Sequence, residues 1–417
     1  MNNKEPQSEE LAADGSTSGV EYELSGEASD PFDPASISIE SRIVPMDSLL
    51  RRLRQGSIRL APNFQRASVW DSEKSSLLIE SLMLRIPLPM FYVSANTDGS
   101  WDVVDGLQRL TTIRNFMLGG ERTPDGQLSV PEARSFKLCK LEFWGDRFDD
   151  KDFSELLNDP ANARIVNNIA ETELRFTVIN PGTPEEVKRN IFKRINTGGM
   201  PLTAQEIRHA LYQGPATDLL LVLLNRPCFE KVRLTIDDSR MAARELILRF
   251  LAFYLREIGE FAFGGMDKFL SDTLRILNRK LPAPNADISN LFKGDWEPTV
   301  LHFSEQKIIA AFDIAMERCD DFFGPYAFRK AVPNSRRPPI NKALFEVWTT
   351  IFARLSDQEF QTLKSRQEEF YDLYEGLLTS DFDRSIGRDA ATFHGVIDRY
   401  SVLNHLVAYV LGQSHDS

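Results

Sequence analysis

The stretch WDVVDGLQRLTTIRNFML, residues 101–118, changes from a strand pattern to a helix pattern within a few residues. Its first four residues are rich in β-forming types, and the Asp105-Gly106 pair that follows is a turn signal. The remaining residues repeat apolar side chains at the spacing of a helix that buries one face. That apolar stripe consists of Leu107, Leu110, Ile113 and Met117. We therefore predict a strand, a tight turn and a helix over 107–118.

Two polar residues at the start of this helix, Gln108 and Arg109, are explained neither by the turn nor by the apolar stripe. The first turn of a helix presents unpaired backbone N–H groups and the positive end of the helix dipole. Together with Gly106 and a planar guanidinium, these groups predict a phosphate-binding site. An arginine paired with a nearby carboxylate, and an Asp105 that caps the helix, would explain the same residues, so both interpretations stay open.

The rest of the chain predicts an α+β protein, in which a small α/β domain is followed by a large helical region. Further strands are expected at 90–95, 136–144 and 174–179, and helices between Asp47 and Gly56 and over 74–85. Beyond residue 184 nearly every segment has a helical pattern. Those helices are expected at 185–194, 204–213, 217–225, 239–257, 266–279, 304–322, 340–354, 357–378 and 389–411. We place the two folded domains at 39–183 and 184–417.

Residues 1–38 carry nine acidic residues, one basic residue and few large apolar side chains. Such a segment cannot bury enough apolar surface to offset its chain entropy, so we predict a disordered acidic tail that adds little to stability. Much of the net charge of −12 therefore lies at the N-terminus. Three widely spaced cysteines, no long apolar run and no basic-apolar leader favour a reduced cytoplasmic location without a membrane partner.

Two further segments place polar and basic residues beside a predicted helix start. APNFQRASVWDSEK, residues 61–74, has a Gln-Arg pair between two aromatic residues. FKRINTGGMPLTAQEIRHALY, residues 192–212, has an Asn-Thr-Gly-Gly turn flanked by arginines. Helix punctuation alone would also explain the second segment, because short motifs are weak signals when taken singly.

Taken together, NFQRASVW, VVDGLQRLTTIRNF and FKRINTGGMPLTAQEIRHALY resemble the N-terminal domain of the GmrSD-type modification-dependent restriction endonucleases. The family's hallmark is a strand followed by Asp-Gly-Gln-Gln-Arg. The resemblance covers about residues 40–215, and the segment DFDRSIGRDAATFHGVIDRYSVLNHL extends it to about residue 411. It implies a ParB- and sulfiredoxin-like mixed sheet with a helical extension. It also implies links to nucleotide binding and hydrolysis, to DNA modification sensing and to phage defence.

Carried over residue by residue, the hallmark falls on Asp105, Gly106, Gln108 and Arg109. The resemblance implies catalytic roles for Asp105, Gln108 and Arg109 in a nucleoside triphosphatase, with Mg²⁺ as a candidate metal and the base of the nucleotide open. The residues expected to bind the nucleotide and its phosphates are Gln65, Arg66, Gly106, Arg109, Arg194, Asn196, Thr197 and Gly198. Leu107 stands where the family usually has glutamine. It belongs to the apolar stripe, so we expect helix packing to survive.

A second departure concerns the His-Asn-His nuclease domain that full-length members of the family carry. His394, Asn404 and His405 are too close together for such a nuclease and fit a single helix. We find no metal-ligand spacing, P-loop or serine nucleophile elbow elsewhere in the sequence. Nuclease activity is therefore expected to come from a separate partner chain.

A basic segment in the helical region is the candidate DNA-binding surface. Residues 324–343 contain no acidic residue, and Pro333, Pro338 and Pro339 predict a loop. Such a loop can neutralise DNA phosphates. The candidate DNA-binding residues are Arg329, Lys330, Arg336, Arg337 and Lys342. Solvated surface charge is the alternative interpretation, because most charge runs are only that.

Three functions stay open. The first is a nucleotide-dependent DNA-sensing component of a restriction or anti-phage defence system, acting with a separate nuclease. The second is a non-enzymatic regulator that keeps the fold as a DNA- or protein-binding module. The third is a stand-alone nuclease that uses unrecognised carboxylates. Nucleotide hydrolysis separates the first from the second, and metal-dependent DNA cleavage by the purified chain would support the third.

Overall fold

The computed structural model describes residues 9–12, 15–23, 38–60, 70–123, 125, 127–184, 187–188, 190–192, 203–262, 265–280 and 304–412. The chain forms two compact units. Residues 30–211 form the sheet unit, and residues 1–29 together with 212–417 form the helical unit. The division falls after Leu211 rather than at residue 183, because helix α8 (Ala204–Leu211) packs on the sheet through Ile207.

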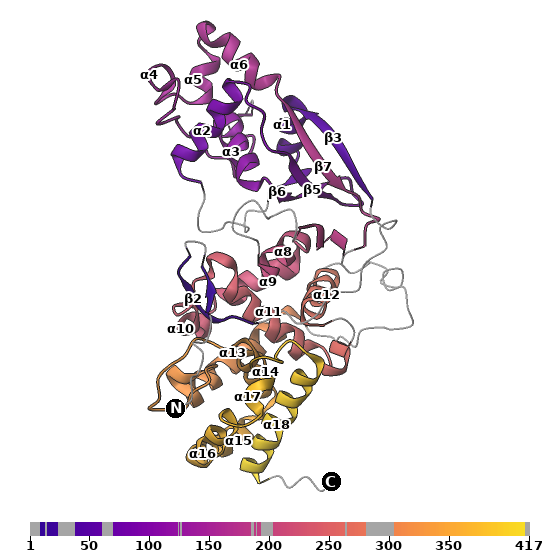
Figure 1. Ribbon diagram of the computed structural model, residues 1–417, viewed down its shortest axis with the longest axis vertical. Coiled ribbons are helices and arrows are strands. Elements are labelled where there is room, and N and C mark those ends of the chain that lie inside the picture. The colour runs from indigo at the N-terminus through magenta and orange to yellow at the C-terminus, as the bar shows by residue number, and fades with distance from the viewer. Residues whose placement is uncertain are drawn as a thin grey trace. The chain divides into compact units, whose positions relative to one another are not determined.

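A five-stranded sheet forms the centre of the sheet unit (Figure 1). Its strands are β3 (Ile39–Pro45), β4 (Ile58–Arg59), β5 (Phe91–Ala95), β6 (Trp101–Asp105) and β7 (Glu173–Ile179). Their spatial order is β3-β7-β5-β6-β4. The β3–β7 and β5–β6 pairs are antiparallel, whereas the β5–β7 and β4–β6 pairs are parallel. The mixed sheet that the resemblance implied is therefore confirmed.

The main core of the sheet unit lies between one face of this sheet and a layer of helices. The helices are α1 (Met46–Arg54), α2 (Ser72–Met83), α3 (Leu107–Leu118), α4 (Gly145–Phe148), α5 (Phe153–Leu157) and α6 (Ala163–Ala170). The predicted apolar stripe of α3 is confirmed, because all four of its residues are buried in this core or pack against it. The helix is buried more widely than the stripe suggests. Thr112 is 4% exposed, and its hydroxyl lies 3.5 Å from that of Ser75 on α2.

The strand expected over residues 136–144 is wrong, because this segment forms no strand in the structure. Four of its backbone N–H groups bind side chains of α2 instead of a neighbouring strand. The carboxylate of Glu80, which is 2% exposed, accepts the N–H groups of Glu142, Phe143 and Trp144 at 2.9, 2.8 and 3.0 Å. Alternating apolar residues therefore pack against the helix layer without joining the sheet.

The helical unit is built mainly from helices, and those longer than four residues lie where the sequence predicts helix (Figure 1). They are α9 (Pro215–Leu224), α10 (Glu230–Arg233), α11 (Ala242–Leu255), α12 (Gly265–Lys280), α13 (Glu305–Phe323), α14 (Lys342–Arg354), α15 (Asp357–Ser365), α16 (Gln367–Leu378), α17 (Phe382–Ser385) and α18 (Phe393–Leu411). The single helix expected over 357–378 is two helices, which meet at Arg366. Every residue of α14 from Lys342 to Phe352 is buried, so this helix forms the centre of the unit. Within the described residues, no helix is long and apolar enough to cross a membrane.

The expectation that residues 1–38 are disordered is wrong for residues 9–12 and 15–23. These residues form a hairpin of β1 (Glu9–Leu11) and β2 (Thr17–Glu21), which belongs to the helical unit. Val20 is fully buried. The N–H of Glu21 donates to the carbonyl oxygen of Ile340 at 2.8 Å, and the N–H of Ile340 donates to that of Gly19 at 3.0 Å. The hairpin thus extends the backbone hydrogen bonding of the segment that leads into α14.

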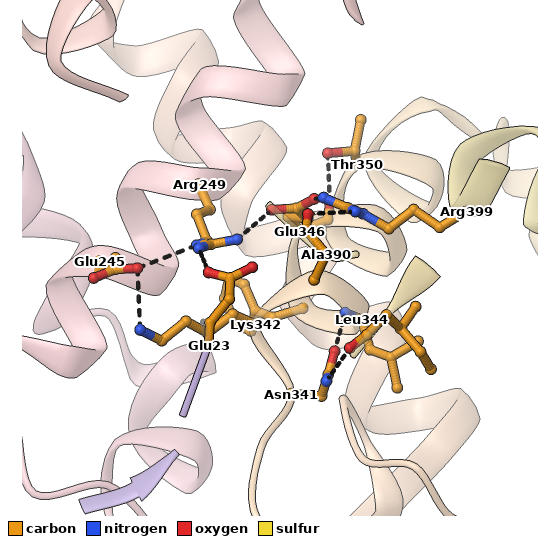
Figure 2. A network of polar contacts seen from close by, with 12 residues as sticks. Glu23, Glu245, Arg249, Asn341, Lys342, Leu344, Glu346, Thr350, Ala390 and Arg399 are labelled. Atoms are coloured by element: carbon orange, nitrogen blue, oxygen red, sulfur yellow. Dashed lines mark hydrogen bonds and ion pairs between the residues drawn. The ribbon is translucent and has the colours of Figure 1, made fainter. Parts of the chain in front are cut away.

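Acidic residues of this N-terminal segment complete an ion-pair network inside the helical unit (Figure 2). The network comprises Glu10, Glu23, Glu245, Arg249, Lys342, Glu346 and Arg399. Glu23 pairs with Arg249, and Glu10 pairs with Lys342, whose Nζ also lies 3.1 Å from Glu245. The composition of the segment predicts a solvated tail. The carboxylates of Glu10 and Glu23 instead compensate two cations that are almost fully buried.

Glu346 occupies the centre of the network and has no exposed side-chain surface. It accepts from Nη1 of Arg249 at 2.9 Å and from Nε of Arg399 at 2.8 Å. Burial raises the pKa of the Glu346 carboxyl, and the neighbouring Arg399 and Arg249 guanidinium groups oppose that shift. Buried charges of this kind hold a fold together only while every partner is present.

Removal of residues 1–23 is expected to destabilise the helical unit by roughly 3–5 kcal/mol, because Arg249 and Lys342 would each lose a carboxylate partner in the interior. Urea unfolding followed by circular dichroism measures the change. Asp321→Asn is the control, because Asp321 forms a partly exposed ion pair with Lys364, and its loss should change stability by less than about 1 kcal/mol. An unchanged unfolding curve for the truncated chain would show that the hairpin adds no stability.

Candidate functional site

The turn between β6 and α3 requires a glycine. Gly106 has a φ of 92°, in the left-handed region, and a Cβ at this position would lie 2.3 Å from Cδ1 of Phe91. Gly106 is also the N-cap of α3. One of the two interpretations of the sequence assigned helix capping to Asp105. The structure instead directs the Asp105 carboxylate at Arg109.

The guanidinium of Arg109 is engaged inside the sheet unit. Its Nη2 donates to Oδ2 of Asp105 at 3.0 Å and to the carbonyl oxygen of Met90 at 3.3 Å. Nη1 donates to the carbonyl oxygen of Pro89, and the guanidinium carbon lies 4.5 Å from the ring centroid of Phe91. Only 12% of the side chain is exposed. Arg109 therefore joins the start of α3 to the chain that leads into β5, as the ion-pair interpretation predicts.

Two groups at the start of α3 remain accessible. The carboxylate of Asp105 is 36% exposed although it is paired with Arg109. Gln108 is half-buried, and its Oε1 accepts the backbone N–H of Trp70 at 3.4 Å, a contact that uses only the carbonyl end of the amide. The helix start beside them is the positive end of the α3 dipole. A carboxylate, an amide and helix N–H groups are thus gathered at one end of β6.

The other predicted phosphate ligands, Gln65, Arg66, Arg194, Asn196, Thr197 and Gly198, lie outside the described residues. Described residues of the 61–74 and 192–212 segments lie at the same end of β6. Trp70 of the first segment contacts Gln108. Phe192 and Ile207 belong to the second segment. Both pack in a small cluster with Val104 of β6.

Residues 47–213 match the family model of the GmrSD restriction endonuclease, N-terminal domain. Residues 47–213 are a GmrSD restriction endonuclease N-terminal domain. This GmrSD domain spans α1 to α8, includes the Gly106 turn and Arg109, and is found in GmrSD restriction systems. A comparison with curated proteins gave no match.

The GmrSD domain also holds a buried carboxylate that sequence analysis missed. Asp102 on β6 is 7% exposed, and its Oδ2 accepts from Nδ2 of Asn96 at 2.7 Å. Its Oδ1 lies 4.0 Å from Nη1 of Arg59, beyond hydrogen-bond distance. Burial raises the pKa of Asp102, and the hydrogen bond from Asn96 opposes the shift. The signal in the sequence is an acidic residue within the predicted strand, where Asp102 stands between Trp101 and Val103.

The structure separates the five predicted DNA-binding residues into exposed and buried sets. Arg336 and Arg337 are exposed. Arg329 is partly buried and donates to the carbonyl oxygen of Pro338. Lys330 is 11% exposed and pairs with Asp383 at 3.0 Å. The prediction is wrong for Lys342, which lies in the ion-pair network and is 5% exposed, because a side chain at that depth cannot reach a phosphate.

The nuclease-like residues lie on α18, as the spacing predicts. His394, Asn404 and His405 all belong to this one helix. Nδ1 of His405 lies 2.7 Å from the carbonyl oxygen of Ser401, one turn earlier. In the part of the chain that the structure describes, no group of three or more His, Cys, Asp or Glu side chains could hold a metal ion.

Arg109→Ala is expected to lower the stability of the sheet unit by roughly 2–3 kcal/mol, because the substitution leaves the Asp105 carboxylate and two carbonyl oxygens without their charged donor. Arg109→Lys should recover only part of this loss, since an ammonium lacks the planar fork. Thermal unfolding without ligand measures both effects. Arg164→Ala on the exposed face of α6 is the control, with a change of at most about 0.5 kcal/mol. Equal melting temperatures for Arg109→Ala and the parent would refute this structural role.

Proposed function

We propose that the GmrSD domain binds a nucleoside triphosphate at the start of α3, and that the chain is a nucleotide-dependent DNA-sensing component of a restriction or phage defence system. The arrangement of the described residues at one end of β6 carries this proposal. The Gly106 turn supplies the helix start, Trp70 contacts Gln108 there, and Phe192 and Ile207 pack with Val104. A helix N-terminus favours an anionic ligand through its N–H groups and its dipole.

The contacts of Arg109 change the role that we propose for this residue. Its guanidinium already serves a carboxylate, two carbonyl oxygens and an aromatic ring. We therefore assign Arg109 as a positioning residue, which fixes Asp105 beside the helix start. Asp105 is the group that would orient water or hold Mg²⁺, and Gln108 would contact a phosphate oxygen. Gln65, Arg66, Arg194 and Asn196 are the proposed donors from the other two segments.

DNA sensing is assigned to the exposed arginines of the 324–343 segment. Arg336 and Arg337 are adjacent and exposed, so they can approach phosphates without breaking an internal contact. We propose that a separate nuclease subunit cleaves the DNA, because the candidate nuclease residues lie on one helix.

A regulator without hydrolytic activity is the second candidate function. Leu107 stands in place of the hallmark glutamine and packs against the core of the sheet unit. An apolar side chain at this position cannot donate to a phosphate. Such a domain could bind a nucleotide and respond to it without hydrolysing it.

Nucleotide binding is expected to raise the melting temperature of the parent protein. At about 100 times the dissociation constant, the ligand adds roughly 2.7 kcal/mol of stability. Thermal shift with ATP, GTP, CTP and UTP, each with Mg²⁺, identifies the nucleotide. Gln108→Ala should reduce the ligand-induced shift and leave the melting temperature without ligand nearly unchanged, because its one contact is long. Asn167→Ala, on the exposed surface of α6, should behave like the parent.

Asp105→Asn separates the two candidate functions. If the parent hydrolyses the nucleotide, this variant should retain the ligand-induced shift and lose phosphate release. A parent that binds without releasing phosphate would support the non-hydrolytic regulator. The absence of a shift with all four nucleotides would overturn the binding proposal.

Charge reversal at Arg336 and Arg337 is expected to weaken DNA binding across sequences and to reduce its salt dependence. Each phosphate contact adds about one unit to the slope of log K against log salt, so the double variant should lose up to about two units. Fluorescence anisotropy over a salt series measures the slope. The control is charge reversal at the exposed Arg388. Arg366 is not used, because its side chain is bound to Glu369 and to the carbonyl oxygen of Val410. If the double variant keeps the affinity and the salt slope of the parent, Arg336 and Arg337 are solvated surface charge and do not bind DNA.

A further inference from the structure

The β3 strand lies at one edge of the five-stranded sheet. All seven of its residues pair with β7, and in the described part of the chain no strand pairs with its other side. The N–H of Asn180 donates to the carbonyl oxygen of Ser38, and the N–H of Met46 donates to that of Thr172. Even-numbered residues of this segment therefore direct their backbone groups toward β7, because hydrogen-bonded and non-hydrogen-bonded pairs alternate in an antiparallel ladder.

The odd-numbered residues Ile39, Ser41 and Ile43 consequently direct their N–H and C=O groups to the outer edge. Ile39 is 43% exposed and Ile43 is 60% exposed. Sheet edges are usually protected against pairing by charges, prolines or covering segments. In β3, Pro45 is the last residue and Val44 precedes it. The outward N–H groups of Ile39, Ser41 and Ile43 therefore lie before the proline.

The sequence of this edge is complementary to itself. Residues 39–43 read Ile-Glu-Ser-Arg-Ile. In an antiparallel pairing of two copies about Ser41, the Ile39 of one copy faces the Ile43 of the other, and Glu40 faces Arg42. Each isoleucine then meets an isoleucine and each charge meets its opposite. A strand paired about its centre satisfies the isologous symmetry of a two-fold dimer.

The hydrogen-bond phase fits the same register. The Ser41–Ser41 and Ile39–Ile43 pairs use the outward backbone groups, so they form the hydrogen-bonded pairs of the new ladder. The Glu40–Arg42 pairs fall at the non-hydrogen-bonded positions, where cross-strand side chains are closest. The side chains of Glu40 and Arg42 are 38% and 47% exposed, and within one chain they pair with each other. Both can therefore turn to the opposite strand.

We propose that two copies of this chain associate through β3, with their edges paired antiparallel about Ser41 and their two sheets joined into one. The alternating charge pattern favours a second copy over an unrelated strand, because an arbitrary partner would not place an acid opposite Arg42 and a base opposite Glu40. Pro45 ends the pairing, since it has no N–H to donate.

Sedimentation velocity over a concentration series tests for the dimer, and Ser41→Pro tests the surface. The N–H of Ser41 points outward, so its loss breaks the dimer ladder and spares the internal β3–β7 ladder. The variant should be monomeric at concentrations where the parent is dimeric, with an unchanged circular dichroism spectrum. Ser41→Ala is the matched control and should remain dimeric.

Charge exchange keeps the proposal testable if Ser41→Pro fails to fold. Arg42→Glu and Glu40→Arg each place like charges opposite one another twice, which should weaken self-association by roughly tenfold. An equimolar mixture of the two variants restores both opposite-charge pairs and should dimerise like the parent. The proposal is overturned if the parent stays monomeric. It is also overturned if neither Ser41→Pro nor the charge variants change the dissociation constant of the dimer.

Discussion

The contact between Arg109 and Asp105 holds together the part of the GmrSD domain on which its candidate site depends. One guanidinium connects the start of α3, the end of β6 and the carbonyl oxygens that precede β5. This geometry is available only because Gly106 takes a left-handed conformation with Phe91 against it. The hallmark Asp-Gly-x-x-Arg is therefore a structural unit in this chain. It sets the position of a carboxylate that remains partly accessible beside a helix dipole.

The interior of the helical unit also depends on ion pairs between arginine and carboxylate side chains. Glu346 lies between Arg249 and Arg399 with no exposed surface, and the N-terminal hairpin adds Glu23 to Arg249. The chain thus contributes residues 9–23 to the helical unit before it forms the sheet unit, and it returns to the helical unit at Tyr212. The sheet unit is an insertion, tied to the helical unit at both ends.

Predictions from the sequence were confirmed for segments whose structure is set within a single strand, turn or helix. The strand, turn and helix at 101–118 form as predicted, because Asp105-Gly106 and the apolar stripe depend on nearby residues only. Long-range pairing could not be predicted. The segment 136–144 has a strand pattern, yet three of its backbone N–H groups donate to the carboxylate of Glu80. Likewise, no local signal shows that the acids of the N-terminal segment face Arg249 and Lys342. The site was predicted as a set of residues, but the partners of Arg109 include the carbonyl oxygens of Pro89 and Met90, which no sequence pattern reveals.

Symmetry connects the proposed edge pairing with the proposed role in DNA sensing. A dimer about Ser41 is isologous, so every surface of one copy has a two-fold related equivalent on the other. Each copy carries the exposed Arg336 and Arg337, so a dimer carries two such patches. Because the electrostatic contributions of the two patches multiply in the binding constant, the salt dependence of a dimer would be steeper than that of a monomer. Since Ser41→Pro leaves both arginines in place, a reduced salt slope in that variant, equal to that of a single patch, would link the β3 edge to DNA binding through assembly alone.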